Sequence, residues 1–591
     1  MTSLNRPPME DLHHCREKIL TCAGHALVIG GPGSGKTTIA LQKAISRIKQ
    51  GMAPGQSVLF LSFSRSAVAR ILSAATMQTN QKELECLSIQ TFHSFFWDVV
   101  RCHAYLLGTP SKISLLLPQD EMSLSGGVKY KKEGWDLWEA ERESLFHTDG
   151  RAAFDLFAPK AWELLSGSVH ILHSIAQRYP IIIVDEAQDT GDFAWNCVEL
   201  LSKHTQVLCL ADMEQQIYDY LPGVRPDRVS GIRKSLNPFE IDLGGENHRS
   251  QNTDILLFGN DILNNSPRGA SYTGVSSLKY PKPNLNILPS HDLLKEALNQ
   301  LKKHIPLTNA SAPFSIAILV GTNRSAMDIS KRLRSCGSEG IEHKLYFDNA
   351  KSLLSARLVA FLLEPSYDKI DLQVATCMEL IAASIKATGN YQKKCETLLI
   401  QARNLRSGSS CKAKIKKELE DVISTLKSCV FSGRPEKDWA TIIDILRKST
   451  HLQVREVVSC VDLLGPILPG HSISRGLASR WFKYGSYTQA REALDVALGE
   501  DMMTDGTEPS SGLHVMNFHK SKGRQFDGVI IIGEAKVRDK GVTSSFVCRD
   551  DEDGYKRSRR VLRVAITRAR YHVFLLTPAD LFCPILNGHN L

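Results

Sequence analysis

Short apolar runs, each followed by small or polar residues, recur along the chain and predict the strands of a parallel sheet. The first covers Leu27–Ile29 and leads into a glycine-rich turn, and the second covers Val58–Leu61. The third, Ile181–Val184, consists of four β-branched residues, and the fourth covers Val207–Ala211. Apolar runs of this length, bounded by turn residues, are typical of buried strands. The pattern predicts an α/β fold.

Between the second and third strands the pattern changes to helical spacing. Residues 96–175 contain Trp97, Trp135, Trp138 and Trp162 and lack a further strand that ends in a glycine-rich turn. We therefore expect a mostly helical insertion in the first α/β domain. A chain of 591 residues is also too long for a single core, so two to four domains are expected.

The composition is that of a globular protein with an excess of basic residues. Hydrophobic residues make up 42%, charged residues 23%, and the formal net charge of +9 favours contact with a polyanion. No apolar run approaches the roughly 18 residues of a membrane span, and the N-terminus does not resemble a signal peptide. The 14 cysteines form no C-x-x-C pair, as expected of reduced thiols. We expect a cytoplasmic protein that does not enter a membrane.

The turn after the first strand has the spacing G-x-x-x-x-G-K-T of a phosphate-binding loop. Its residues are Gly30, Gly31, Pro32, Gly33, Ser34, Gly35, Lys36, Thr37 and Thr38. Glycines let the backbone turn its N–H groups toward phosphate oxygens, Lys36 can reach the β- and γ-phosphates, and the Thr37 hydroxyl can ligate Mg²⁺. The stretch predicts a nucleoside triphosphate site.

Two carboxylates follow the third strand, where α/β sheets bind their ligands. Asp185 can hold Mg²⁺ through water, and Glu186 can orient or deprotonate the attacking water. Together with the phosphate-binding loop, this pair predicts hydrolysis of the bound nucleotide.

Eight motifs in fixed order carry a resemblance to a known family. They are GGPGSGKTT, FSRSA, TFHSF, IVDEAQD, ADMEQQIY, ENHRS, HKSKGRQFD and VAITRAR, from residue 30 to residue 570. This set resembles the UvrD/Rep-type (PcrA-like) branch of superfamily 1 DNA helicases and spans nearly the whole chain.

The resemblance implies a role for each matching residue. Lys36 and Thr37 would bind ATP phosphates and Mg²⁺, Asp185 would bind the metal, and Glu186 would be the catalytic base. Gln215 would sense the γ-phosphate. Arg249 and Arg568 would act as arginine fingers from the second motor domain, and Gln525 would lie beside the nucleotide. Guanidinium groups delivered by cleft closure would link hydrolysis to domain motion.

The resemblance also implies a single-stranded DNA path, formed by residues that stack on bases or contact phosphates. These residues are Phe63, Ser64, Thr91, Phe92, His93, Tyr218, Tyr220 and His519.

The family architecture implies two RecA-like domains with parallel sheets, each with a mostly helical insertion. The first domain would comprise 1–95 and 170–240, with the insertion 96–169. The second would comprise 241–365 and 506–591, with the insertion 366–505.

Several positions depart from the family pattern. No glutamine precedes Lys36, whereas the family reads adenine with one near its N-terminus. His248 replaces the aromatic residue expected to stack on the base, and Gln525 stands where the family usually has Glu. These departures put adenine selectivity, but not hydrolysis, in question.

The leading hypothesis is an ATP- and Mg²⁺-dependent motor that translocates 3′→5′ on single-stranded DNA and separates strands at junctions with duplex. One alternative is a DNA-stimulated ATPase that does not unwind alone and serves a nuclease-containing complex, for example in anti-phage defence of the Gabija kind. A second is a non-catalytic binding module on a helicase scaffold. The pathway, whether DNA repair or another, is not specified by these residues.

Overall fold

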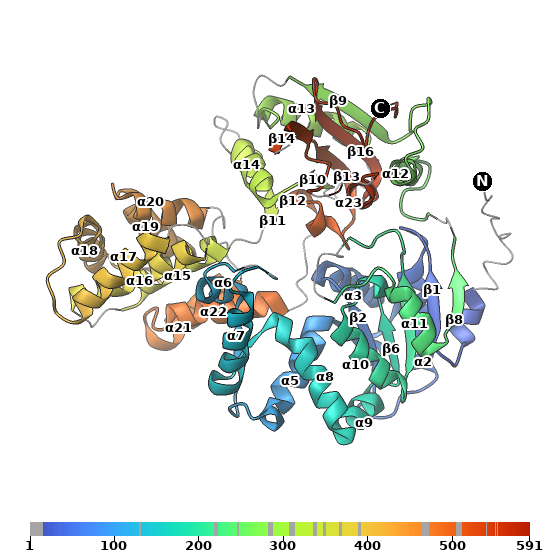
Figure 1. The fold of residues 1–591 in the computed structure, drawn as a ribbon, viewed down its shortest axis with the longest axis horizontal. Helices are drawn as coiled ribbons and strands as arrows, with labels where there is room; N and C mark the ends of the chain where they lie inside the picture. The colour runs from blue at the N-terminus through green and yellow to red at the C-terminus, as the bar shows by residue number, and fades with distance from the viewer. Residues whose placement is uncertain are drawn as a thin grey trace. The chain divides into compact units, whose positions relative to one another are not determined.

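The computed structural model describes residues 16–590, with gaps at 129, 131, 218–222, 245–246, 282–287, 307–313, 335–339, 347–349, 366–368, 388–391, 463–471, 504–510, 539–540, 550 and 552–553. The chain forms two compact units. Figure 1 labels the helices and strands along the chain. Unit 1 comprises 1–95, 161–347 and 505–591, and unit 2 comprises 96–160 and 348–504.

Unit 1 contains, in its described residues, two parallel sheets of six strands each. The first sheet has the order β3-β2-β6-β7-β1-β8. Its strands are β1 (Ala26–Ile29), β2 (Val58–Ser62), β3 (Leu87–Thr91), β6 (Ile181–Val184), β7 (Gln206–Ala211) and β8 (Phe239–Asp242). The four apolar runs of the sequence correspond to β1, β2, β6 and β7, which confirms the α/β prediction.

The second sheet has the order β11-β12-β10-β13-β16-β9. Its strands are β9 (Val275–Tyr280), β10 (Ser315–Val320), β11 (Lys344–Tyr346), β12 (Gly512–Asn517), β13 (Phe526–Ile532) and β16 (Ala569–Pro578). A hairpin of β14 (Ala535–Arg538) and β15 (Gly541–Ser544) is antiparallel. Parallel strands require crossover connections, so each sheet is accompanied by helices.

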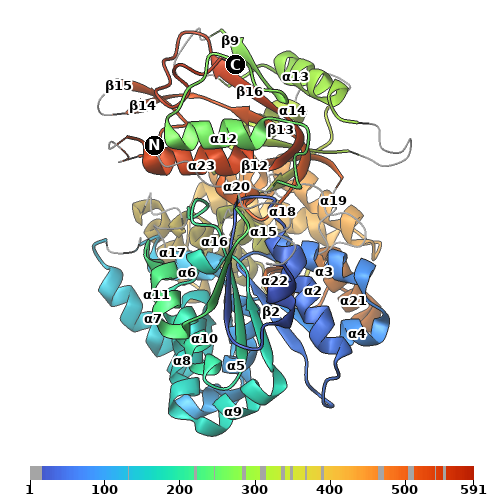
Figure 2. The ribbon, with the colours of Figure 1, turned by 90° about the vertical axis from the view of Figure 1, so that its right-hand side faces the viewer.

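The helices of unit 1 follow the strands in the chain. They are α2 (Lys36–Lys49), α3 (Arg65–Gln78), α4 (Gln81–Glu85), α9 (Val169–Arg178), α10 (Asp192–Ser202), α11 (Arg228–Leu236), α12 (Ile255–Asn264), α13 (His291–Lys303), α14 (Asn323–Arg334) and α23 (Lys556–Ile566). Helices α12 and α23 are nearly 300 residues apart in the sequence, yet they lie side by side (Figure 2). Gly259 permits this, because a Cβ there would lie 3.3 Å from Arg563 Cγ.

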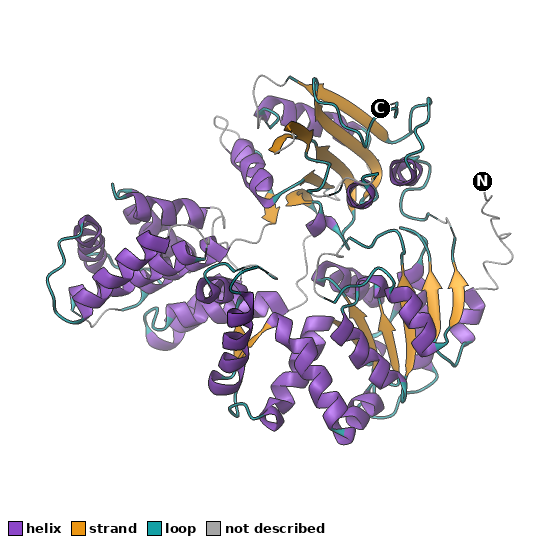
Figure 3. Cartoon of the chain, viewed as in Figure 1, coloured by secondary structure: helices purple, strands orange, loops and turns teal. Residues whose placement is uncertain are grey.

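Unit 2 is mostly helical (Figure 3). Its helices are α6 (Pro118–Ser125), α7 (Trp135–Asp149), α15 (Ala350–Leu363), α16 (Ile370–Lys386), α17 (Gln392–Arg406), α18 (Lys414–Lys427), α19 (Pro435–Arg447), α20 (Leu452–Val461), α21 (Ser472–Tyr484) and α22 (Ala490–Met503). The short strands β4 (Ser114–Leu116) and β5 (Arg151–Ala153) pair in parallel. The chain passes between the units within α5 (Phe92–His103) and α8 (Phe157–Gly167).

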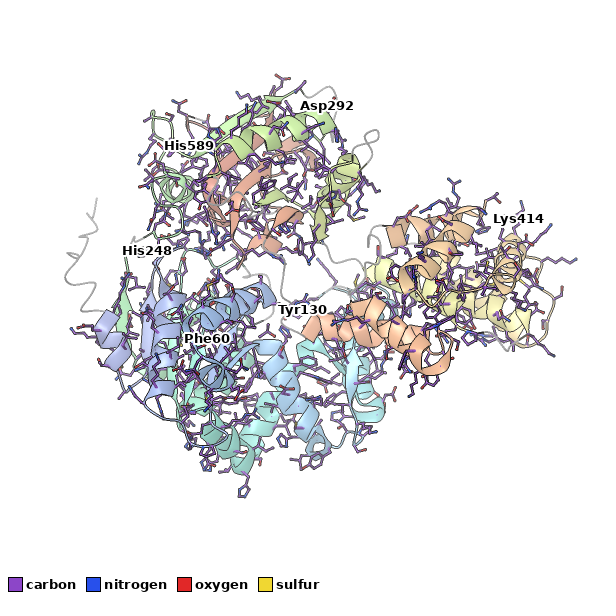
Figure 4. The ribbon with its side chains drawn as sticks, turned by 180° about the vertical axis from the view of Figure 1, so that it is seen from behind. Phe60, Tyr130, His248, Asp292, Lys414 and His589 are labelled. Carbon is purple, nitrogen blue, oxygen red and sulfur yellow. The ribbon has the colours of Figure 1, made fainter. Side chains whose placement is uncertain are left out.

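Each unit has its own apolar interior. In unit 2 a continuous core joins the helices α15 to α22. In unit 1 apolar side chains pack against both sheets, and Phe60, labelled in Figure 4, is fully buried in β2. Among the described helices, none is both long and apolar enough to cross a membrane. The six-part domain division expected from the sequence stays a prediction.

Candidate nucleoside triphosphate site

The glycine-rich turn joins β1 to α2 in the geometry of an anion cradle. Gly33 and Gly35 adopt φ angles of 79° and 87°, in the left-handed region that glycine tolerates at little cost. Gly35 precedes Lys36, the first residue of α2, so the helix N-terminus opens on the turn. Ser34 is buried, and its Oγ has no hydrogen-bond partner among the described residues. An orphaned buried hydroxyl in this turn suits a phosphate oxygen.

Lys36 extends back over the turn. Its Nζ donates to the carbonyl oxygens of Gly30 at 2.6 Å and Gly31 at 2.8 Å, and it lies 3.9 Å from Asp212 Oδ2. Burial lowers the pKa of Lys36, although the Asp212 carboxylate opposes this shift. The Lys36 ammonium group therefore donates to uncharged carbonyl oxygens, which the more strongly accepting phosphate oxygens of a nucleotide can replace.

The two carboxylates after β6 have different environments. Burial, reinforced by the Glu186 charge, raises the pKa of Asp185 to about 6, and Ser62 Oγ donates to Asp185 Oδ2 at 3.3 Å. Burial also raises the pKa of Glu186, but Lys522 and Lys36 outweigh it, so the net shift is downward. Glu186 thus remains an acceptor, as a residue that orients water must.

Glu186 also has an unusual backbone. Its φ of 53° lies in the left-handed region, which costs a non-glycine residue of order 1–3 kcal/mol. The side chain accepts a hydrogen bond from Gln188 Nε2 at 2.6 Å. The turn Ala187–Asp189 that follows is buried, and it holds this strained conformation in place.

Gln215 connects the first sheet to Arg568. Its Nε2 donates to Asp212 Oδ2 at 2.8 Å, while its Oε1 accepts from Arg568 Nη2 at 2.9 Å. Arg568 lies between α23 and β16 and is 2% exposed. Burial lowers its pKa to about 10, although the Glu186 charge opposes this.

Arg249 comes from the loop between β8 and α12. The Asn247 side chain orders this loop by accepting from the backbone N–H groups of Arg249 at 3.1 Å and Ser250 at 3.2 Å. Arg249 Nη1 donates to Thr567 O at 2.8 Å. When the Gln525 side-chain amide is oriented with its oxygen toward Arg249, Oε1 accepts from Arg249 Nε at 3.0 Å.

The predicted residues surround one cavity of about 300 Å³. Its lining includes residues 32–38, Arg70, Asp185, Glu186, Gln215, His248, Arg249, Gly523, Gln525 and Arg568. Gly30 and Gly31 lie behind it as acceptors for Lys36. Their roles stay predictions, although the cation-rich wall and the orphaned Ser34 hydroxyl fit a triphosphate.

His248 is one of the exposed residues that line this cavity. Its backbone N–H donates to Gly33 O at 2.9 Å, and its Cδ2 lies 3.8 Å from where a Gly35 Cβ would be. Arg16 Nη2 lies 3.3 Å from His248 Nε2. Figure 4 labels this histidine.

Two charged residues of this region were not predicted from the sequence. Lys522 is 4% exposed, pairs with Asp189 and donates to Gln215 O at 2.6 Å. Arg70 on α3 donates from Nη1 to Gly523 O at 3.1 Å. Lys522 lies inside the HKSKGRQFD motif, and Arg70 lies three residues after FSRSA. Their closeness to these motifs is the sequence feature that could have marked both as site residues.

The residues predicted for a DNA path lie at the ends of β2 and β3 and in the loop after β12. Ser64 caps α3 by accepting from Ala67 N–H at 3.2 Å, and Thr91 Oγ1 accepts from Ser94 N–H at 3.1 Å. His93 is exposed, whereas Phe92 is 7% exposed, which leaves little of its ring for stacking. Phe63 and His519 are partly buried. Tyr218 and Tyr220 lie outside the described residues.

Comparison with known proteins finds DNA helicases. A family model, the UvrD/REP helicase N-terminal domain, matches residues 13–149 and 129–226. The putative ATP-dependent DNA helicase YjcD of Bacillus subtilis is 21% identical over 638 residues, covering 94% of this chain and 77% of that protein. The chain resembles the UvrD/Rep-type family of superfamily 1 helicases. ATP-dependent DNA helicase PcrA of Staphylococcus aureus is 20% identical to this UvrD-like chain, covering 95% of it and 82% of PcrA.

Two further matches to this UvrD-like chain are partial. DNA helicase II of Haemophilus influenzae is 26% identical over 302 residues, which are 43% of this chain and 40% of that protein. The crystal structure of Pif1 helicase from Candida albicans aligns over 56% of each chain at 11% identity, with a TM-score of 0.27.

Proposed function

We propose that this UvrD-like protein is an ATP-dependent DNA helicase that requires Mg²⁺ and moves 3′→5′ on single-stranded DNA in the cytoplasm. The observation that supports it most is the convergence of Lys36, Glu186 and Arg568 on one cavity. Relatives across nearly the whole chain are named ATP-dependent DNA helicases. The polarity rests on the family alone.

The residues of the cavity divide the work of hydrolysis. The backbone of the glycine-rich turn and Lys36 would bind the phosphates of ATP. Thr37 and Asp185 would hold Mg²⁺, which neutralises phosphate charge. At phosphate sites the protein usually provides few of the ligands of this ion, and phosphate oxygens and water provide the rest. Glu186 would orient the attacking water, and its lowered pKa keeps it an acceptor.

The two arginines would stabilise the charge that develops on the transferred phosphoryl group. Arg568 is already bonded to Gln215, which bonds to Asp212 beside Lys36. A change in phosphate contact at Lys36 would therefore reach Arg568 through two hydrogen-bonded side chains. Single-stranded DNA would bind along the ends of β2 and β3.

A test of this function combines nucleotide binding with strand separation. Glu186→Gln keeps the size of the side chain but removes the acceptor charge, so this variant should bind ATP without cleaving it. Wild-type protein should unwind a 3′-tailed duplex and leave a 5′-tailed one intact. Turnover by Glu186→Gln at the wild-type rate would refute the assigned base, and unwinding from the 5′ tail would refute the polarity.

The same strand assay separates the helicase from its alternative. Single-stranded-DNA-stimulated hydrolysis without unwinding by the pure protein would favour an ATPase subunit that acts with a nuclease. His248 and Gln525, both at the cavity, are the departures that motivate this alternative.

A further inference from the structure

Arg70 is a charged residue of the nucleotide cavity that none of the eight motifs contains. It lies on α3, six residues after the N-cap Ser64, and lines the cavity together with the phosphate-binding turn and Glu186. Its Nη1 donates to the carbonyl oxygen of Gly523 at 3.1 Å. Arg70 thus joins a helix of the first sheet to the loop that follows β12.

Gly523 is seated against the first turn of α3. Its φ is 81°, and a Cβ there would lie 2.5 Å from Ser64 Oγ and 3.3 Å from Ser66 Oγ. No side chain fits between this loop and the helix. A shift of the α3 N-terminus toward this loop would therefore displace Gly523, and Arg70 bonds to the same residue from one turn further along the helix.

The residue before Gly523 reaches the catalytic carboxylates. Lys522 Nζ lies 3.7 Å from Glu186 Oε2, pairs with Asp189 and donates to Gln215 O. A continuous set of contacts thus runs from the end of β2, where Phe63 and Ser64 are predicted to touch DNA, through Gly523 to Glu186.

The charge of Arg70 points to the same cavity. It lowers the pKa of Arg249, which burial and the neighbouring Arg568 charge lower more strongly. Guanidinium groups gathered this closely repel one another, and an anionic ligand would relieve that repulsion.

We propose that Arg70 is a positioning residue that couples single-stranded DNA at the start of α3 to the triphosphate site, through its hydrogen bond to Gly523. This inference rests on the proposed function. When bound DNA displaces the first turn of α3, Arg70 and Gly523 move with it, and this movement shifts Lys522 relative to Glu186. Binding of DNA and of nucleotide then become linked, and the linkage must be reciprocal.

The test measures this linkage without hydrolysis. The affinity of full-length protein for a fluorescein-labelled oligothymidylate is measured by anisotropy, with and without Mg²⁺ and a non-hydrolysable ATP analogue. For the wild type we expect the two dissociation constants to differ by at least about fivefold. Arg70→Met keeps the apolar stem of the side chain without its charge or its donor. In this variant the dissociation constants measured with and without nucleotide should differ by less than about twofold, so their ratio approaches one.

Two further variants separate this role from general damage. Arg70→Lys keeps a charged donor and should recover part of the ratio. Arg233→Ala removes a surface ion pair with Glu240 outside the cavity, so it should keep the wild-type ratio. A wild-type ratio in Arg70→Met would overturn the inference, whereas failure of the wild type to bind the oligonucleotide would overturn the proposed function itself.

Discussion

Arg568 donates a hydrogen bond from Nη2 to Oε1 of Gln215 across 2.9 Å, and both side chains are buried. This bond joins the end of α23 to the loop after β7. Gln215 in turn donates to Asp212, the carboxylate nearest Lys36. The arginine that would stabilise transferred charge is therefore positioned by the residue that would sense the γ-phosphate.

Replacing Arg568 should abolish turnover with little effect on DNA binding. Arg568→Ala removes the guanidinium from the cavity, and loss of a true arginine finger lowers kcat by about 10³-fold or more. Steady-state ATP hydrolysis with saturating single-stranded DNA measures this effect. Arg570→Ala is the matched control, since Arg570 is half-exposed and pairs with Asp527. A loss below tenfold in Arg568→Ala would exclude a finger.

The buried pair of Lys522 and Asp189 should matter for stability. Asp189 is fully buried, and burial raises its pKa to about 7 even though Lys522 opposes this. Lys522→Met leaves the carboxylate without its partner, which should cost about 3–5 kcal/mol. Urea unfolding of the full-length protein at pH 8 measures the loss. The double variant Lys522→Met/Asp189→Leu should recover most of it, and no recovery would contradict this account.

Gly33 should tolerate no side chain. With φ at 79°, a Cβ would lie 2.7 Å from Asn247 Oδ1 and 2.9 Å from Arg249 Cβ. Gly33→Ala should therefore displace the Arg249 loop and weaken binding of a fluorescent ATP analogue by about tenfold, or about 1.4 kcal/mol. Gly24→Ala is the control, because its methyl group meets nothing within 4 Å. Equal affinities in the two variants would refute the docking of this loop.

Unit 1 should lose stability in mild acid. Burial lowers the pKa of both His514 and His572 from 6.5 to about 4. Since the folded-state pKa is depressed, the unfolded chain takes up protons first, so stability is complete above pH 6.5 and falls as the pH decreases toward 4. At pH 5.5 each histidine should cost about 1 kcal/mol.

Substitution can assign this loss to its source. His572 Nε2 lies 2.8 Å from Ser276 Oγ, and the ring stacks on His304. His572→Asn should reduce the difference between urea midpoints at pH 7.5 and pH 5.5, whereas substitution of the exposed His170 should leave it unchanged. An undiminished difference in His572→Asn would show that other groups cause the acid sensitivity.

The strands that form continuous apolar runs could be predicted from the sequence. The strands β1, β2, β6 and β7 are buried on both faces, so each is a continuous apolar run. The strand β8, Phe239–Asp242, lies at the sheet edge and buries only Ile241 among its residues, so its sequence gives little strand signal. The position of a strand at the edge of a sheet is a property of the assembled sheet, so a short stretch of sequence does not reveal it.

The candidate site was predictable to the same extent. Lys36 and Glu186 belong to motifs whose spacing carries their chemistry. By contrast, Lys522 meets Asp189 across 333 residues, and only the packing of the loop after β12 against the first sheet brings them together. Arg70 depends on the rotation of α3 about its axis, which Ser64 and Gly523 fix.

The most direct test of the account is ATP hydrolysis by the pure protein, with and without single-stranded DNA, beside Lys36→Ala. Lys36 Nζ donates to two backbone carbonyl oxygens that phosphate oxygens would replace. We predict Mg²⁺-dependent hydrolysis that single-stranded DNA stimulates strongly and that Lys36→Ala abolishes. Wild-type turnover in Lys36→Ala, or hydrolysis indifferent to DNA, would contradict a DNA-driven motor.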